Sequence, residues 1–175
     1  MTNDDLIHIL NCILTKEICK EVYTVEYEIC KLDISDFDKC SNIWKMNEHK
    51  DLAKRFLSEL QCGNRLTYIY KENGEFLGEI SLVFDACDKD YTIKDKRIYL
   101  SRLVVKKQLR RKGIGRKLVE FIIEVAKNMG YNELSVGVDL CNYAALKLYT
   151  EYGFDKIVFV GEDGDGKFLK LLKVL

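Results

Sequence analysis

The chain has 175 residues, and its 28 acidic and 28 basic side chains give it a formal net charge of zero. This length suits one domain built around one hydrophobic core. A neutral chain is not drawn as a whole to a polyanion, and no stretch approaches the roughly 20 apolar residues of a membrane span. Composition therefore disfavours both a general nucleic-acid binder and a membrane-spanning protein.

The seven cysteines form no CxxC pair, and with only His8 and His49 available they make no zinc-ligand spacing, so no metal is expected. The amino terminus, MTNDDLIHILNCIL, carries acidic rather than basic residues before its apolar run, unlike a signal peptide. An odd number of cysteines without a secretory signal predicts reduced thiols, mostly buried, in a cytoplasmic protein.

The beginning of the chain predicts a helix and then a strand. Apolar residues recur at helical spacing between residues 5 and 20, so residues 1–20 are expected to form a helical extension to a main domain of residues 21–175. The run VYTVEYEICKL, residues 22–32, is rich in β-branched and aromatic residues and reads as the first strand of that domain.

Two helical segments and a hairpin are expected next. Ser35 is placed to cap a helical segment that includes Trp44, and a second helix is expected over about residues 48–60. Two strand-like runs then flank Asn73 and Gly74, the pair that a type I′ turn favours, which predicts a β-hairpin.

The second half of the chain reads as strand, glycine turn, helix, strand. RIYLSRLVV, residues 97–105, is nearly continuously apolar, as expected for a strand buried on both faces. A glycine-containing turn and a helix ending at Gly130 follow, and then a strand at residues 133–138, a helix at residues 142–152 and two closing strands. One α/β domain therefore fits the chain, with a turn at the carboxyl end of a strand, where open sheets bind ligands.

The glycine turn has the features of a site for an anion. Gly113 and Gly115 allow the backbone to present several N–H groups where the helix begins, and seven Lys and Arg side chains lie within residues 106–117. The spacing of a nucleotide-binding P-loop is missing, and a dinucleotide fingerprint would need a third glycine where the chain has Leu118. The pyrophosphate of coenzyme A suits an RxxGxG pattern at a strand-to-helix turn.

Two separated motifs carry a resemblance to a known family. LSRLVVKKQLRRKGIGRKLVEF, residues 100–121, resembles the acetyl-CoA motif of the GNAT superfamily of N-acetyltransferases, with Arg110, Gly113 and Gly115 at its fixed positions. NYAALKLYTEYGF, residues 142–154, resembles the NxxAxxLYxxxGF segment of the same family, at the family's separation.

The resemblance implies an α/β (α+β) fold, with a mixed, mostly antiparallel sheet of about seven strands that splays into a V and is flanked by helices. It implies acetyl-CoA as co-substrate, with its pantetheine arm paired to the backbone of residues 103–105 and its pyrophosphate held by the N–H groups of residues 109–115. The residues expected to bind acetyl-CoA are Leu103, Val104, Val105, Leu109, Arg110, Arg111, Lys112, Gly113, Ile114, Gly115, Arg116, Asn142 and Ala145. The helical spacing of Asn142, Ala145 and Tyr149 also predicts that these three share one helix face.

Transfer of an acetyl group from a thioester to an amine needs a base for the amine and an acid for the leaving thiolate. By resemblance, the hydroxyl of Tyr149 protonates the thiolate. Glu79, in the hairpin strand, is a candidate base that acts directly or through water, or else a solvated strand carboxylate. Arg102 stands where some relatives place a carboxylate base, and it either binds an acidic group of the acceptor or forms a structural ion pair.

Two other functions remain open on the sequence alone. A catalytically silent member of the family would bind acetyl-CoA as a sensor, and a nucleic-acid-binding domain would use the KKQLRRKGIGRK cluster on phosphates. We expect the enzyme, acting on a small-molecule amine rather than a protein amine, without a nucleic-acid or membrane partner. The resemblance also allows a homodimer through the carboxyl-terminal strands.

Overall fold

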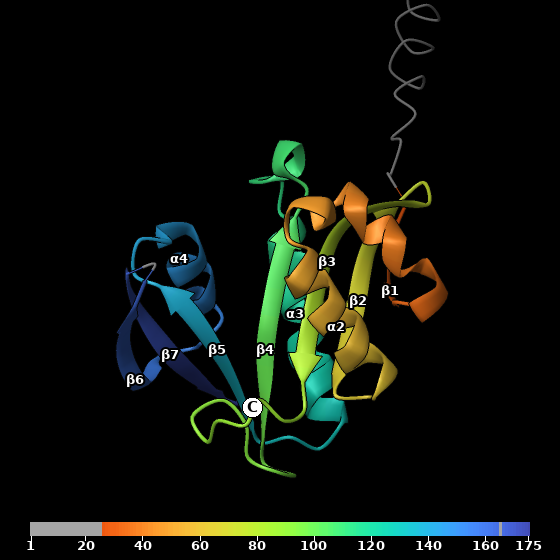
Figure 1. Cartoon of the computed structure of the whole chain (residues 1–175). Helices are drawn as coiled ribbons and strands as arrows, with labels where there is room; N and C mark the ends of the chain where they lie inside the picture. The colour runs from red at the N-terminus through yellow and green to blue at the C-terminus, as the bar shows by residue number, and fades with distance from the viewer. Residues whose placement is uncertain (1–25, 165) are drawn as a thin grey trace, which may run out of the picture.

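The computed structural model describes residues 26–164 and 166–175. The expected helical extension of residues 1–20, and the first residues of the strand expected at 22–32, lie outside the described residues. Within the described part, a seven-stranded sheet runs in the order β1-β2-β3-β4-β5-β7-β6 (Figure 1). Neighbouring strands are antiparallel except β4 and β5, which are parallel. The mixed, mostly antiparallel sheet expected from the sequence is confirmed.

The strands follow the predicted apolar runs closely. Their bounds are β1 Tyr27–Lys31, β2 Arg65–Glu72, β3 Glu75–Val83, β4 Arg97–Val105, β5 Glu133–Asp139, β6 Lys156–Asp163 and β7 Gly166–Val174. Asn73 and Gly74 join β2 to β3 with φ angles of 50° and 78°, the two left-handed residues that a type I′ turn requires. The predicted hairpin is therefore confirmed.

The helices are α2 Lys50–Gln61, α3 Ile114–Asn128 and α4 Tyr143–Glu151, with 3₁₀ helices η1 Ile34–Asn42, η2 Met46–Glu48 and η3 Lys107–Leu109. The expected cap at Ser35 was wrong. Asp33 caps η1 instead, because its carboxylate accepts a hydrogen bond from the Ser35 backbone N–H at 2.8 Å.

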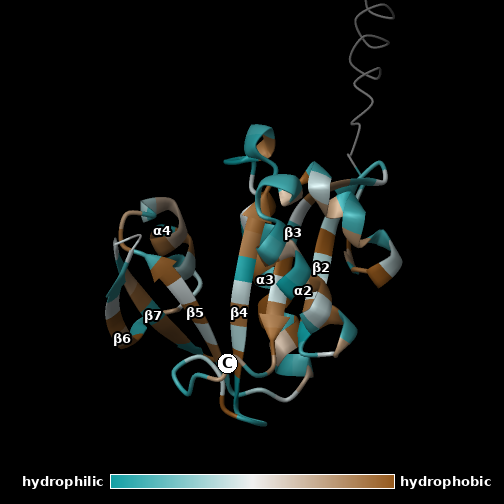
Figure 2. Cartoon of the chain, in the orientation of Figure 1, coloured by the Kyte–Doolittle hydropathy of each residue, from teal (hydrophilic) through white to brown (hydrophobic). Residues whose placement is uncertain are grey.

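Two apolar layers hold the helices on opposite faces of the sheet. Buried side chains of α3, among them Leu118 and Ile122, pack with Ile80 of β3 and with Tyr149 of α4 in the larger core. A smaller core on the other face joins α2 and η1 to β2 and β3. Figure 1 shows α3 behind the sheet and α2 with the 3₁₀ segments in front. In Figure 2 apolar colour follows β3 and β5, whereas the loop between β4 and α3 is mostly hydrophilic.

Gly78 of β3 lets α3 lie close to the sheet. A β-carbon at this position would lie 3.1 Å from Leu118 Cδ1 and 3.3 Å from Ile114 Cγ2. Because these contacts are tighter than ordinary van der Waals packing, a side chain here would push α3 outward. The absence of a side chain at Gly78 thus fixes the depth at which the first turn of α3 sits.

Among the helices of residues 26–164 and 166–175, none has the length and the apolar character that a membrane span requires.

Candidate functional site

Strands β4 and β5 part midway along their length. Their parallel pairing runs from Arg97 with Glu133 to Leu100 with Val136, although β4 continues to Val105 and β5 to Asp139. Beyond Leu100 the edge of β4 that faces β5 has no strand partner. This divergence leaves the second half of β4 only half-buried, so the expectation that β4 is buried on both faces was wrong for that half.

A β-bulge lies where the two strands separate. Ser81 of β3 pairs with Arg102 of β4 whereas Leu82 pairs with Leu100, so Ser101 is an extra residue in β4. The Ser101 hydroxyl is buried, and no described residue hydrogen-bonds to it. The bulge therefore places an unpaired polar group at the closed end of the divergence.

The divergence forms a cavity of about 630 Å³ between β4, the start of α3 and α4. This volume lies within the range of about 300–1,000 Å³ that is typical of small-molecule sites. The residues that line it are Leu103, Val104, Val105, Leu109, Arg110, Arg111, Gly113, Gly115, Arg116, Asn142, Ala144, Ala145, Lys147, Leu148 and Glu151.

The loop before α3 presents unused backbone donors at the cavity. Gly113 is the residue that caps α3, and its φ is 87°; Arg111 also adopts a positive φ, 67°. In the described part of the chain, the backbone N–H groups of residues 111–116 have no acceptor, since the first bond of α3 joins the Lys117 N–H to the Gly113 carbonyl at 3.2 Å. Free N–H groups and the positive end of the α3 dipole make this loop suitable for an anion.

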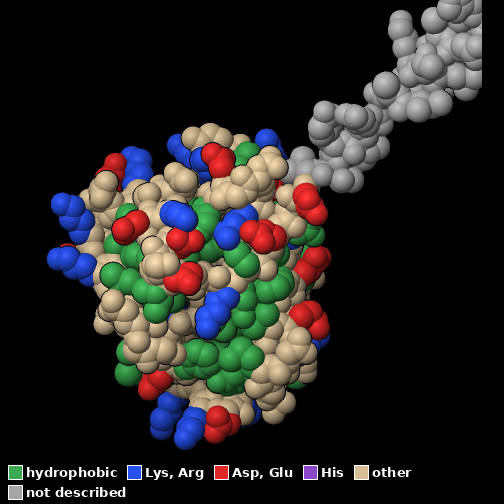
Figure 3. All heavy atoms as spheres, turned by 90° about the vertical axis from the view of Figure 1, so that its right-hand side faces the viewer, with side chains coloured by type: hydrophobic (Ala, Val, Ile, Leu, Met, Phe, Trp, Pro, Cys, Tyr) green, Lys and Arg blue, Asp and Glu red, His purple; other side chains and the backbone are tan. Residues whose placement is uncertain are grey.

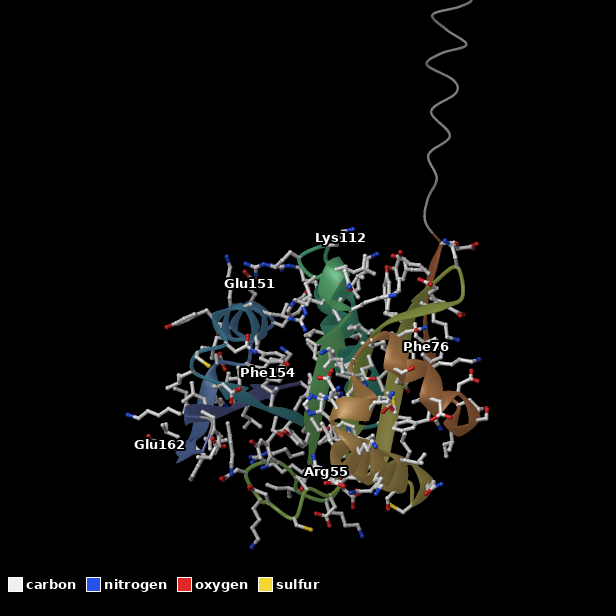
Figure 4. All side chains as sticks on the ribbon, turned by 45° about the horizontal axis from the view of Figure 1, so that its top comes forward. Arg55, Phe76, Lys112, Glu151, Phe154 and Glu162 are labelled. Carbon is white, nitrogen blue, oxygen red and sulfur yellow. The ribbon has the colours of Figure 1, made fainter. Side chains whose placement is uncertain are left out.

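Arginines and lysines surround these donors, and some of them are already paired. Arg110 donates from Nε to the Val105 carbonyl at 3.2 Å, which ties the loop to the end of β4. Arg116 forms an ion pair with Glu151 of α4, and this contact raises the pKa of Arg116. Figure 4 shows Glu151 on α4 and Lys112 at the outer tip of the loop.

Most of the residues expected from the sequence to bind acetyl-CoA line this one cavity, but Lys112 and Ile114 do not. Lys112 is exposed, and Ile114 is only 4% exposed because its side chain packs into the core beneath α3. A role for Ile114 is then limited to its backbone. The expectation overlooked Ala144, Lys147, Leu148 and Glu151, which α4 brings to the cavity opposite the start of α3. The available signal was that Lys147, Leu148 and Glu151 lie three, four and seven residues after Ala144, the spacing of one helix face.

The second motif divides its residues between the cavity and the core. Asn142 is the N-cap of α4, where its side-chain oxygen accepts from the Ala145 backbone N–H at 3.2 Å. Tyr149 is 5% exposed, packs edge-on against Phe154 with ring centroids 5.4 Å apart, and does not line the cavity. The three residues of the motif therefore do not form one continuous polar face.

Burial raises the pKa of the Tyr149 hydroxyl above its ordinary value, and Tyr99 of β4 raises it further. The phenol is consequently neutral and protonated at physiological pH. No described residue hydrogen-bonds to this hydroxyl, so its proton is not committed to another group.

Glu79 lies on the opposite face of the sheet and is buried, with 3% exposure. One carboxylate oxygen accepts from Nε of Arg102, and the other accepts from Nε1 of Trp44 at 3.1 Å. The interpretation of Glu79 as a solvated carboxylate was wrong, and of the two readings of Arg102 the ion pair is present. Trp44 was the overlooked partner, since nothing in the sequence brings residues 44 and 79 together.

The described residues contain no group of three or more His, Cys, Asp and Glu side chains that could hold a metal ion. His49 caps α2 through its backbone, without a side-chain hydrogen bond. Cys62, Cys87 and Cys141 are exposed, so the expectation that most cysteines are buried was wrong for these three, whereas Cys40 is buried.

Comparison with known proteins agrees with this architecture. The family model described as "Acetyltransferase (GNAT) family" matches residues 27–154. Among curated proteins, N-acetyltransferase family 8 member 3 of Mus musculus is 29% identical over 108 residues, which make up 62% of this chain and 46% of that protein. The chain thus matches less than half the length of this relative.

Solved structures share the fold at low sequence identity. The ribosomal-protein-S18-alanine N-acetyltransferase from Escherichia coli has a TM-score of 0.68 at 21% identity, and the alignment covers 85% of this chain and 94% of that one. A GNAT family acetyltransferase from Elizabethkingia anophelis with acetyl-CoA bound has a TM-score of 0.66 at 20% identity, covering 85% and 98% of the two chains. With the family model matched over residues 27–154, this chain belongs to the acetyltransferase (GNAT) family.

Proposed function

We propose that the protein is an acetyl-CoA-dependent N-acetyltransferase that moves an acetyl group from the thioester to a primary amine. The observation that carries this proposal is the cavity between β4, the start of α3 and α4, which has unpaired strand backbone along one wall and free N–H groups at one end. The similar protein from Elizabethkingia anophelis was solved with acetyl-CoA bound, which agrees with this use of the fold.

The two ends of the cavity suit different parts of the coenzyme. Backbone N–H groups of residues 111–116 and the side chains of Arg110 and Arg111 would hold the pyrophosphate, because charge-assisted hydrogen bonds to phosphate are strong. The unpaired edge of β4 at Leu103, Val104 and Val105 would extend its hydrogen bonding to the pantetheine amides, as a strand does with any extended partner. The thioester would then lie toward the bulge at Ser101.

Acetyl transfer in this arrangement requires two proton movements. The amine nitrogen attacks the thioester carbonyl carbon, the carbon–sulfur bond breaks, and the sulfur leaves as a thiolate that must be protonated. We assign the protonation to Tyr149, the hydroxyl of which is neutral and has no described hydrogen-bond partner. To reach the sulfur, this hydroxyl must meet the coenzyme where α4 borders the cavity through Ala145 and Leu148.

The proton lost by the amine is assigned to ordered water rather than to direct transfer to Glu79. Both carboxylate oxygens of Glu79 already accept hydrogen bonds, from Arg102 and Trp44, and the side chain is buried. A carboxylate held in this way is a poor direct base but can fix the position of its partners. Glu79 could still orient the water that takes the proton.

The acceptor that we propose is a small amine. The name of the Escherichia coli relative refers to a protein alanine as acceptor, and a protein amine is the alternative here. Nucleic acid is disfavoured because Arg116 is paired with Glu151 and because acidic and basic side chains are interspersed on the face seen in Figure 3. A homodimer through the carboxyl-terminal strands is compatible with the exposure of Ile157 and Val160 on β6.

A catalytically silent acetyl-CoA binder is the second candidate. The observation in its favour is that Tyr149 packs in the core rather than along the cavity. Such a protein would bind acetyl-CoA but would release no CoA with any amine. In such a protein, Tyr149→Phe would change neither acetyl-CoA binding nor any release of CoA.

The test begins with isothermal titration of the reduced protein with acetyl-CoA. Micromolar binding that Gly113→Glu abolishes would support the coenzyme site, and an amine screen would follow, with CoA release measured by chromatography. Chromatography avoids thiol-reactive dyes, which the seven cysteines would consume. If acetyl-CoA gives no heat and leaves the melting temperature unchanged at millimolar concentration, the proposed function is refuted.

A further inference from the structure

Three arginines from three different elements converge on one aromatic ring. The guanidinium carbons of Arg55 in α2, Arg65 in β2 and Arg102 in β4 lie 5.4, 4.0 and 5.1 Å from the ring centroid of Phe56. This ring belongs to α2, on the sheet face opposite α3. Figure 4 shows Arg55 on the side of α2 that is nearer to β4.

Two carboxylates form ion pairs with these three arginines. Glu59 accepts from Nε and Nη2 of Arg65, both at 2.7 Å, and lies 3.7 Å from Nε of Arg55. Glu79 accepts from Nε of Arg102. No other carboxylate in the described part of the chain pairs with any of the three arginines. The cluster therefore carries one positive charge more than its carboxylates neutralise.

Two of these arginines also have donors without acceptors. The Arg65 side chain is only 3% exposed, and although its Nη1 is buried, this nitrogen has no hydrogen-bond partner among the described residues. Burial lowers the pKa of Arg65, and the charges of Arg102 and Arg55 lower it further. Arg102 uses only its Nε, so both of its terminal nitrogens lack a described partner. The unpaired Nη1 of Arg65 is buried and leaves uncompensated positive charge behind Arg102, whereas the terminal nitrogens of Arg102 are not buried and are open to an anion.

Arg102 stands beside the place where the acetyl group would be transferred. It follows the bulge residue Ser101, and Leu103 directly after it lines the coenzyme cavity. Its guanidinium carbon lies 4.3 Å from the Trp44 ring centroid, and its Nε is held by Glu79. A guanidinium that is stacked on a ring and fixed from one side presents its remaining edge in a defined direction. That edge belongs to the face of β4 opposite α3.

We infer that the acceptor amine also carries a carboxylate, which the terminal nitrogens of Arg102 bind with the charge of Arg65 behind them. This inference rests on the proposed function and names the substrate class of the same site. Planar guanidinium and carboxylate groups pair through two parallel hydrogen bonds, which fixes orientation as well as position. A free amino acid has its amine one carbon away from its carboxylate, so this contact would hold the nitrogen next to Arg102, and the following residue, Leu103, lines the coenzyme cavity.

The first test measures binding without turnover, with N-acetyl amino acids as product analogues. We would titrate the CoA-saturated protein with N-acetylphenylalanine and N-acetylglycine, and with the carboxamide of each compound. The carboxylates are expected to bind about 10- to 100-fold more tightly than their amides, the range given by a charge-assisted pair. Equal affinity of acid and amide, or no heat with any carboxylate, would overturn the inference.

Variants separate recognition from structural support. Arg102→Lys keeps a charge beside Glu79 but loses the planar fork, and the double variant Arg102→Gln with Glu79→Gln removes the pair without leaving a buried charge alone. Both variants are expected to bring the affinity of the N-acetyl amino acid close to that of its carboxamide, while the affinity for CoA stays unchanged. The double variant Lys127→Gln with Glu124→Gln removes an exposed ion pair of α3, and it serves as the charge-matched control for the double variant of Arg102 and Glu79. If the variants weaken acid and amide by the same factor, Arg102 has only a structural role and the inference fails.

Turnover distinguishes this inference from the function on which it rests. Phenylalanine, phenylalaninamide and phenethylamine would be compared as acceptors, with a preference for the amino acid expected mainly in KM. Acetylation of all three at equal kcat/KM would support the proposed function and refute the carboxylate inference. Selective binding of the N-acetyl acids without acetylation of any amine would support the recognition site and refute the enzyme.

Discussion

Two substitutions of Gly113 distinguish the effect of an added charge on acetyl-CoA affinity from the effect of a strained backbone. Gly113 caps α3 at a φ of 87°, and a β-carbon built there meets nothing within 4 Å. Gly113→Ala therefore costs only left-handed strain, about 1–2 kcal/mol of the free energy of unfolding. For a chain of this size, such a loss lowers Tm by about 2–8 °C. Acetyl-CoA affinity should remain close to that of the wild type, because the free N–H groups stay in place.

Gly113→Glu adds the same strain and also a negative charge at the proposed pyrophosphate site. Two unit charges about 4 Å apart repel by about 4 kcal/mol at an effective dielectric constant of 20. Allowing the flexible side chain to swing away, we expect a loss of about 2–4 kcal/mol, which is roughly 30- to 1,000-fold in Kd.

Isothermal titration with acetyl-CoA, paired with thermal melts of both variants, measures these effects. The reasoning is refuted in two ways. If Gly113→Glu binds as tightly as the wild type, the phosphates are not held at this loop. If Gly113→Ala loses as much affinity as Gly113→Glu, the backbone conformation rather than the added charge explains the loss.

Three further predictions concern the acid, the packing of α3 and the response to pH. Tyr149→Phe should lower kcat by about 10²- to 10⁴-fold in steady-state assays, with acetyl-CoA affinity unchanged, because only the proton is removed; unchanged kcat would exclude Tyr149 as the acid. Gly78→Val should destabilise the fold by about 1–3 kcal/mol in denaturant titrations, since its β-carbon alone would lie 3.1 Å from Leu118 Cδ1; an unchanged midpoint would show that α3 can move away freely. Lys170 holds the pKa of Asp88 below its usual range, at a Nζ to Oδ2 distance of 2.7 Å. This contact therefore stabilises the fold above the unfolded pKa of about 3.9 and is lost as pH falls through the lower folded value. Asp88→Asn should be less stable than the wild type at pH 7, and the difference should shrink at pH 3; a difference independent of pH would contradict the assignment.

Much of the fold is predictable from local patterns because those patterns are local in origin. The Asn73 and Gly74 pair requires two positive φ angles, and this alone sets the β2–β3 hairpin. Asp33 shows the limit of such reasoning, since Asp33 and Ser35 are both good caps and the choice between them depends on the exact start of η1.

The loop before α3 was the most predictable part of the candidate site. Gly113 and the cations around it are contiguous in sequence, and they lie at a strand-to-helix turn that both flanking patterns define. The contribution of α4 was only partly predictable. The Asn142 side chain is engaged in capping, and the depth of Tyr149 in the core follows from how α4 packs against Phe154.

By itself the sequence determined the strands, the glycine turn and the two motifs, because hydrophobic periodicity and backbone freedom are properties of neighbouring residues. Only the tertiary structure decided that Glu79 is buried between Arg102 and Trp44, and that Arg55, Arg65 and Arg102 gather around Phe56. These side chains come from different strands and helices. Which arginine pairs with which carboxylate is therefore decided only when the sheet assembles. The divergence of β4 from β5 likewise depends on where their pairing stops, at Leu100 and Val136. The sequence of either strand alone does not reveal this end point.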